Sequence, residues 1–177
     1  MKAHKFLRHG ARGPLSQHVW SQPPAASNWL EAAAGPLVPC RNGLHACRID
    51  QLSYWIADEL WEVELGDEWI EAPHSLVARR ARLLRRIEAW QGAAALEFTR
   101  ACLERAQAAS ARAGQSSALA SQYLEATQQF ADAGKPALTA YASALVHAAL
   151  GPADQQMASF DAERRAQGQL LAMATGI

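Results

Sequence analysis

The chain has 177 residues, of which 50% are hydrophobic and 19% are charged, a balance typical of a globular protein with a buried core. Its 17 basic residues are balanced by 17 acidic ones, so we expect no bulk attraction to nucleic acid or to an anionic membrane. No secretory leader precedes the three cysteines, and no apolar run approaches the roughly 20 residues that span a bilayer. We therefore predict a cytoplasmic protein whose thiols are reduced or bound to metal.

The chain begins with signals of a short strand followed by a long loop. Residues 3–7 alternate in polarity, which predicts the strand. Residues 8–28 are rich in Gly, Pro, Ser and Gln, and a loop of this length is more often functional than accidental. Trp20 and Trp29 are expected to anchor this loop, and residues 29–32 are expected to form a second short strand.

The clearest local signals lie just after residue 40. The dipeptide Asn42-Gly43 predicts a tight turn, because both residues tolerate positive φ. Residues 44–48 alternate after this turn, which predicts a strand with His45 and Cys47 on the same face.

A helix and a hairpin are expected next. Asp50 is a suitable N-cap for a helix with apolar residues at helical spacing, namely Leu52, Trp55, Ile56 and Leu60. Alternation over residues 60–65 predicts a half-buried strand, and Gly66-Asp67 predicts a hairpin that pairs it with residues 68–72. Residues 76–90 fit either one helix or two short strands.

The composition shifts to Ala, Gln and Leu after Trp90, where we predict four helices joined by short loops. Ser116 or Ser117 is expected to cap the second helix, and Pro136 to begin the third. The apolar stripe of that third helix is predicted to be Leu138, Tyr141, Leu145 and Ala149. The chain is thus expected to combine a mixed α+β domain (residues 1–90) with a helical bundle or cap (residues 91–177). The helices carry few large apolar residues and are expected to need a partner surface, either the first domain or a second copy.

Three residues near the Asn-Gly turn are candidate metal ligands. Cys40, His45 and Cys47 supply the sulfur and nitrogen donors that zinc prefers. A closed tetrahedral site would need a fourth ligand from His74, His4 or His9. The alternative is that both cysteines are small core residues and His45 is hydrogen-bonded in a cleft.

Residues 8–14, Arg-His-Gly-Ala-Arg-Gly-Pro, resemble the signature of the histidine acid phosphatases. This resemblance implies that His9 is a phosphate-accepting nucleophile and that Arg8 and Arg12 hold the phosphate. The alternation of strands and helices that builds the large parallel sheet of that family is not found in the sequence.

A dense basic run consists of Arg79, Arg80, Arg82, Arg85 and Arg86. It favours either an RNA or phosphate surface, or a solvated face that pairs with the acidic residues of positions 58–71. Because the charges balance, we expect the second arrangement and no nucleic-acid binding.

Residues 3–90 also resemble a family of uncharacterised bacterial and phage proteins. The resemblance rests on His-Lys-Phe-Leu at residues 4–7, on Cys-x-x-Gly-Leu-His-x-Cys at residues 40–47, and on Leu-Trp-Glu-Val-Glu-Leu at residues 60–65. It favours strands rather than a helix in residues 76–90, and it implies no particular activity.

The order of the expected elements is similar to that of small ADP-ribosyltransferase-like domains. This resemblance implies that His4 and His45 hold NAD and that Glu88 stabilises an oxocarbenium-like transition state. Trp20 and Tyr54 are the aromatic residues expected to contact the cofactor. We thus predict a small-ligand domain, in its sharpest form an NAD- or nucleotide-handling transferase or glycohydrolase. The alternative is a non-catalytic assembly module that binds a protein partner, or another copy, through its C-terminal helices.

Overall fold

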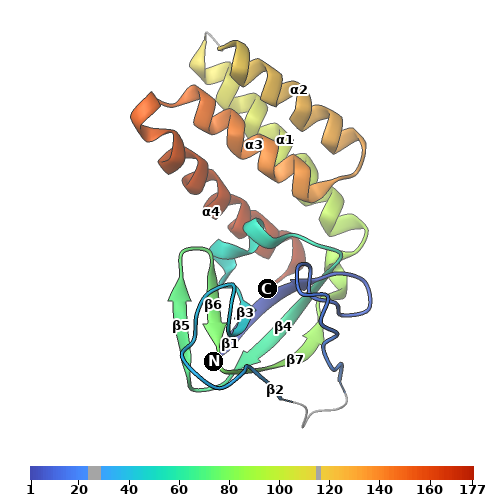
Figure 1. Cartoon of the computed structure of the whole chain (residues 1–177). Helices are drawn as coiled ribbons and strands as arrows, with labels where there is room; N and C mark the ends of the chain where they lie inside the picture. Colours follow the sequence, from blue (N-terminus) through green and yellow to red (C-terminus); the bar gives the residue numbers. More distant parts are fainter. Residues whose placement is uncertain (24–28, 115–116) are drawn as a thin grey trace. The chain divides into compact units, whose positions relative to one another are not determined.

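Strands occupy the first half of the chain and helices the second, as the computed structural model shows for residues 1–23, 29–114 and 117–177 (Figure 1). The protein therefore has the α+β fold that the sequence predicts. The chain divides into two compact units, Met1–Gln91 and Gly92–Ile177.

The first unit contains a four-stranded antiparallel sheet with the order β1-β4-β7-β2. Its strands are β1 (Lys2–Leu7), β2 (Leu30–Glu31), β4 (Glu59–Leu65) and β7 (Arg80–Arg86). On one face, β4 contributes Trp61, Val63 and Leu65 to the core, as its alternation predicts. Glu62 and Glu64 point to the other face.

The arginines of β7 pair with carboxylates across this sheet. Arg85 Nε lies 2.6 Å from Glu62 Oε2, and Arg82 Nη2 lies 2.6 Å from Glu64 Oε2. The other arginines of the basic run also have carboxylate partners, which are Glu68, Glu31, Glu59 and Glu88. The run is thus charge-compensated, which is the arrangement expected from the sequence.

A second, three-stranded sheet has the order β3-β6-β5 and consists of β3 (Leu44–Ala46), β5 (Trp69–Ala72) and β6 (Ser75–Ala78). The predicted pairing of residues 60–65 with residues 68–72 is therefore wrong. Strand β4 pairs on both sides with β1 and β7, while β5 turns back onto β6. The turn signal at Gly66-Asp67 is local, whereas the longer ladders of β4 and their ion pairs decide which strands become its neighbours. Residues 76–90, ambiguous in the sequence, supply strand residues of β6 and β7.

The two sheets meet where β1 contacts β3. His4 N donates to Cys47 O at 2.9 Å, and Cys47 N donates to His4 O at 2.7 Å. After β3, the predicted helix is a shorter 3-10 helix, η1 (Ile49–Trp55). Its first turn is closed by the Gln51 side chain, which accepts from Arg48 N at 3.0 Å, and it ends before Ile56.

The second unit consists mainly of four helices: α1 (Ala93–Ala113), α2 (Ala118–Asp132), α3 (Pro136–Leu150) and α4 (Gln156–Thr175). Short 3-10 turns, η2 (Glu88–Trp90) and η3 (Ala153–Gln155), precede α1 and α4. Ser117 caps α2, since its Oγ accepts from Ala120 N at 3.1 Å; Ser116 lies outside the described residues. None of the described helices combines the length and apolarity needed to span a bilayer.

The buried face of α3 differs from the predicted stripe. Its packed residues are mostly small: Thr139, Ala140, Ala142, Ser143, Ala144 and Val146. Leu138 and Tyr141 are instead 46% and 52% exposed. Because α3 packs against α1, α2 and α4, its backbone must approach three neighbours closely, and small side chains permit this.

Candidate functional site

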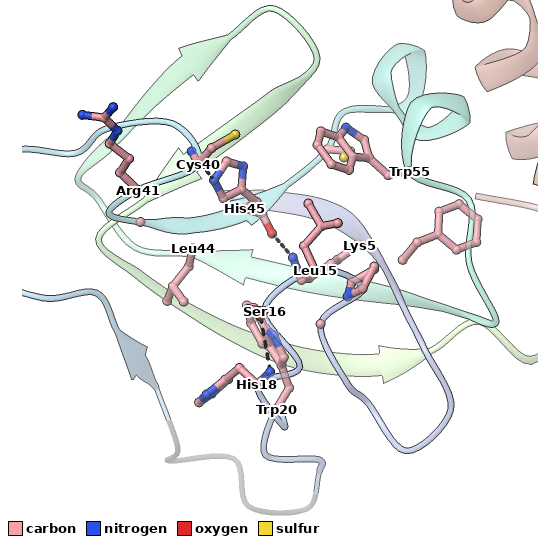
Figure 2. Close-up of a pocket in the computed structure, with 15 residues that line it drawn as sticks. Lys5, Leu15, Ser16, His18, Trp20, Cys40, Arg41, Leu44, His45 and Trp55 are labelled. Carbon is pink, nitrogen blue, oxygen red and sulfur yellow. Dashed lines mark hydrogen bonds between the residues drawn. The ribbon is translucent and has the colours of Figure 1, made fainter. Parts of the chain in front are cut away.

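The first unit contains a pocket of about 350 Å³ (Figure 2). Three segments distant in sequence line it: β1, the loop at residues 13–20, and residues 40–47. Trp55 of η1 completes the lining. We call this cavity the Lys5 pocket, after the amine that β1 presents to it.

The loop wall of the pocket is folded back on itself by its own backbone. Gly13 N donates to His18 O at 2.8 Å, and Gln17 N donates to Gly13 O at 3.0 Å. Trp20 follows this turn and is buried in the core, as expected for an anchor of the loop. Leu15, at the tip, is 82% exposed and borders the pocket.

The base of this loop is held by the carboxylate of Glu59. Gly10 N and Ala11 N each donate to it at 3.1 Å, and the indole N–H of Trp61 donates at 3.0 Å. Desolvation alone would raise the pKa of Glu59, but these hydrogen bonds, with Arg86 nearby, outweigh it and lower the pKa. Glu59 is thus an ionised, buried support of the pocket wall.

Lys5 lies on the core face of β1, between the buried residues Ala3 and Leu7. Its Nζ donates to His45 O at 2.6 Å and lies 5.0 Å from the centroid of the Trp20 ring (Figure 2). No carboxylate among the described residues forms an ion pair with it. Desolvation lowers the pKa of Lys5 to about 8, while the neighbouring Cys47 thiol acts in the opposite direction.

The imidazole of His45 lines the pocket, but both of its nitrogens are engaged. Nε2 accepts from Cys40 N at 3.1 Å, so the ring proton lies on Nδ1 and is donated to Ser75 Oγ at 3.2 Å. Desolvation, followed by the charge of Lys5, lowers the pKa of His45 and favours this neutral form. His45 therefore braces the turn that contains Cys40, whose φ is +63°.

The predicted NAD residues do not meet in this structure. The described residues that line the Lys5 pocket include His45 but neither His4 nor Glu88. Alternation along β1 places His4 on the face opposite to Lys5, where desolvation lowers its pKa and the charges of Glu62 and Arg85 act on it. The Glu88 side chain is 72% exposed and pairs with Arg86 at 3.4 Å.

Of the two aromatic residues expected to contact a cofactor, Trp20 lines the pocket and Tyr54 does not. The Tyr54 ring stacks on His74 instead, with centroids 4.1 Å apart and planes inclined by 19°. Sequence reasoning overlooked Lys5 and Trp55. The signal for Lys5 was present: a lysine that shares its strand face with Ala3 and Leu7 is unusual, because lysines are rarely buried without a partner.

The metal-site prediction is not supported by the geometry. The three candidate ligands Cys40, His45 and Cys47 line the same pocket, yet the described residues contain no group of three or more His, Cys, Asp or Glu side chains able to hold an ion. The Nε2 lone pair of His45 already accepts a backbone N–H. Burial also raises the pKa of Cys47 to about 12, which disfavours the thiolate that binds zinc.

The phosphatase-like motif has a structural use in this fold. Arg8 and Arg12 form a backbone bridge, so residues 8–12 make a tight turn after β1. The N–H groups inside this turn are bound by carboxylates, since His9 N donates to Asp58 Oδ2 at 3.1 Å and the next two donate to Glu59. These donors are therefore not free for a phosphate. The His9 side chain is 78% exposed, and both sheets are antiparallel rather than parallel.

Comparison of the chain with protein-family models, with curated proteins and with solved structures gives no match. The case for a function therefore rests on the geometry of the Lys5 pocket.

Proposed function

We propose that the first unit is a small-molecule-binding domain whose ligand occupies the Lys5 pocket. The observation that carries the proposal is a cavity beside an amine without a carboxylate partner in the described residues, walled by apolar side chains. These side chains include Leu15, Trp20, Leu44 and Trp55. Ligand sites commonly combine such an apolar wall with a few polar groups that orient the ligand.

The size of the pocket favours a compact ligand. Its volume of about 350 Å³ lies near the lower end of the range of about 300–1,000 Å³ that ligand sites span. One or two rings fit this volume better than a whole dinucleotide does. A narrower prediction is that the domain acts on NAD. Release of nicotinamide is the assay for this reaction, and His45→Ala is its negative control.

A ligand-observed NMR screen of aromatic fragments, with NAD and adenine nucleotides added to the library, tests the proposal. We expect hits with Kd below about 1 mM that are lost in Leu15→Glu, which places a charge at the exposed rim of the pocket. Met173→Glu is the matched control, because Met173 is also exposed but belongs to α4. The proposal fails if no compound binds, or if binding is equally strong in Leu15→Glu.

A second candidate function, self-association through the helical unit, is favoured by a separate observation. Six large apolar side chains of this unit are exposed: Leu96, Leu119, Leu138, Tyr141, Met157 and Met173. Sedimentation velocity of the wild type should then show a concentration-dependent dimer that Tyr141→Glu weakens. A monomer at all concentrations would remove this candidate.

A further inference from the structure

Lys5 occupies a position where a charged amine lowers the stability of the fold, because it loses part of its hydration. Lysines are almost never buried unless they are paired, and this half-buried one lies between two core residues of β1. Its described polar contacts are one backbone carbonyl, that of His45, and the face of Trp20. The contact with His45 is not the only link between β1 and β3, because two hydrogen bonds between His4 and Cys47 also join these strands.

The other nucleophilic groups of the pocket are less available than this amine. The His45 lone pair is occupied by Cys40 N. The Cys47 thiol is buried, and desolvation raises its pKa to about 12. Desolvation makes Lys5 a better nucleophile, because it lowers the pKa of the amine to about 8 and so leaves a substantial neutral fraction near pH 8. A lysine with the ordinary pKa of 10.5 is almost wholly protonated at that pH.

We propose that the Nζ atom of Lys5 forms a reversible imine with an aldehyde or ketone whose apolar, preferably aromatic, body fills the Lys5 pocket. This inference rests on the proposed function, since it names the ligand class of the same site. The apolar wall of Trp20, Leu44 and Trp55 suits the body of such a ligand, and Lys5 extends from β1 into the same space (Figure 2).

The reaction is balanced without any further reagent. The lone pair of the neutral amine attacks the carbonyl carbon, a C–N bond forms, and the carbonyl oxygen becomes a hydroxyl group. One proton of the amine nitrogen supplies the hydrogen of that hydroxyl. The hydroxyl then leaves as water with the second proton of the nitrogen, which leaves a neutral C=N bond. The sum is amine plus carbonyl giving imine plus water, and the open rim supplies solvent for the proton transfers. Excluding water from the apolar part of the pocket favours the imine.

The chain offers an unusually clean test because it has only three lysines. Lys2 and Lys135 are exposed, and together with the amino group of Met1 they are internal controls. The full-length protein is incubated at pH 8 with 2-naphthaldehyde and sodium cyanoborohydride, which reduces an imine to a stable secondary amine. Chymotryptic peptides are then analysed by mass spectrometry.

We expect Lys5 to be labelled at least tenfold faster than Lys135. We also expect its labelling rate to rise with pH around 8, and Lys5→Arg to abolish this adduct while leaving the labelling of Lys135 unchanged. Equal or slower labelling of Lys5 in the wild type overturns the proposal, and this comparison does not require any variant to fold.

A parallel NMR titration with 2-naphthylmethanol distinguishes ligand binding from imine formation, because this alcohol has the same ring system but no carbonyl group. Binding of the alcohol without an adduct on Lys5 refutes the imine and leaves the ligand-binding function standing. If neither compound engages the pocket, the imine proposal fails, and the aromatic-fragment screen decides the ligand-binding function.

Discussion

The Nζ atom of Lys5 lies 2.6 Å from the backbone oxygen of His45, and this contact joins β1 to β3 at the wall of the pocket. The same His45 residue uses its ring to hold Cys40 N and Ser75 Oγ. One residue therefore orients the amine through its backbone and shapes the cavity through its side chain.

Replacing Lys5 by methionine should stabilise the first unit at neutral pH. Folding lowers the pKa of Lys5 from 10.5 to about 8, so between these values the unfolded chain binds a proton that the folded chain has lost. The cost of burying the charge is present in full below pH 8 and fades as the pH rises to 10.5. Lys5→Met should thus be more stable than wild type by up to about 3 kcal/mol at pH 7, with the gap closing near pH 10.5.

Urea unfolding followed by tryptophan fluorescence measures this gap, because all six tryptophans lie in the first unit. Taking the difference between variant and wild type cancels the contributions of titrating groups that do not interact with Lys5, but not that of the neighbouring Cys47. A gap that is unchanged from pH 7 to pH 10.5 would show that Lys5 is not desolvated.

The neutral form of His45 predicts a loss of stability in acid. Its pKa is lowered on folding, so its contribution is complete above the ordinary value of 6.5 and is lost as the pH falls from there toward the folded-state pKa. His45→Gln, whose amide oxygen can accept from Cys40 N without titrating, should reduce the pH dependence between pH 7 and pH 5. His45→Ala should lower the free energy of unfolding by about 1–3 kcal/mol at pH 7, and by less at pH 5.

His4→Gln is the control for this experiment, because the pKa of His4 is also lowered by desolvation but His4 does not border the pocket among the described lining residues. If only His4→Gln changed the pH dependence, the role assigned to His45, a neutral imidazole hydrogen-bonded to Cys40 N, would be wrong.

Substituting Glu59 by glutamine should weaken the loop that walls the pocket. Its carboxylate accepts three N–H groups, and losing the charge should cost about 2 kcal/mol at pH 7. Because folding lowers the pKa of Glu59, the wild-type advantage is present above pH 4.5 and decreases as the pH falls through the folded-state value. Glu31→Gln, an exposed residue of β2, should change the tryptophan-monitored transition by less than about 0.5 kcal/mol; a similar loss in both variants would count against the special role of Glu59.

The helical unit should depend on Glu163, whose buried carboxylate accepts the N–H of Arg105 Nε, shared between its two oxygens, and one N–H of Nη2. The same carboxylate receives Gln167 Nε2 at 3.2 Å and lies 3.4 Å from His147 Nε2. Glu163→Ala leaves these groups unpaired and should lower the free energy of unfolding by about 2–4 kcal/mol. Circular dichroism at 222 nm reports this transition, and Glu104→Ala, at an exposed site on α1, should have little effect.

Metal removal should leave the first unit unchanged. Burial of Cys47 and engagement of His45 disfavour a zinc site, so EDTA should not shift Tm, and the purified, untagged protein should contain far less than one zinc per chain. Stoichiometric zinc, together with a lower Tm in EDTA, would reinstate the site predicted at Cys40, His45 and Cys47.

Local signals in the sequence determined the class of fold and the approximate positions of the first five strands. The Ser117 cap and Pro136 at the start of α3 act within a few residues, so they are readable without a structure. The alternation of β4 likewise revealed its buried face. The turn predicted at Asn42-Gly43 instead lies at residues 39–41, where Cys40 has the positive φ and Asn42 pairs with Val38.

Tertiary structure alone decided which of these pieces become neighbours. Strand β4 pairs with β7 rather than with β5, and α3 buries its small residues rather than Leu138 and Tyr141, because long-range packing outweighs the local pattern. The candidate site has the same origin. Lys5 is an ordinary lysine until a loop and two sheets enclose it, and the desolvation that changes its chemistry comes from residues up to 50 positions away, such as Trp55.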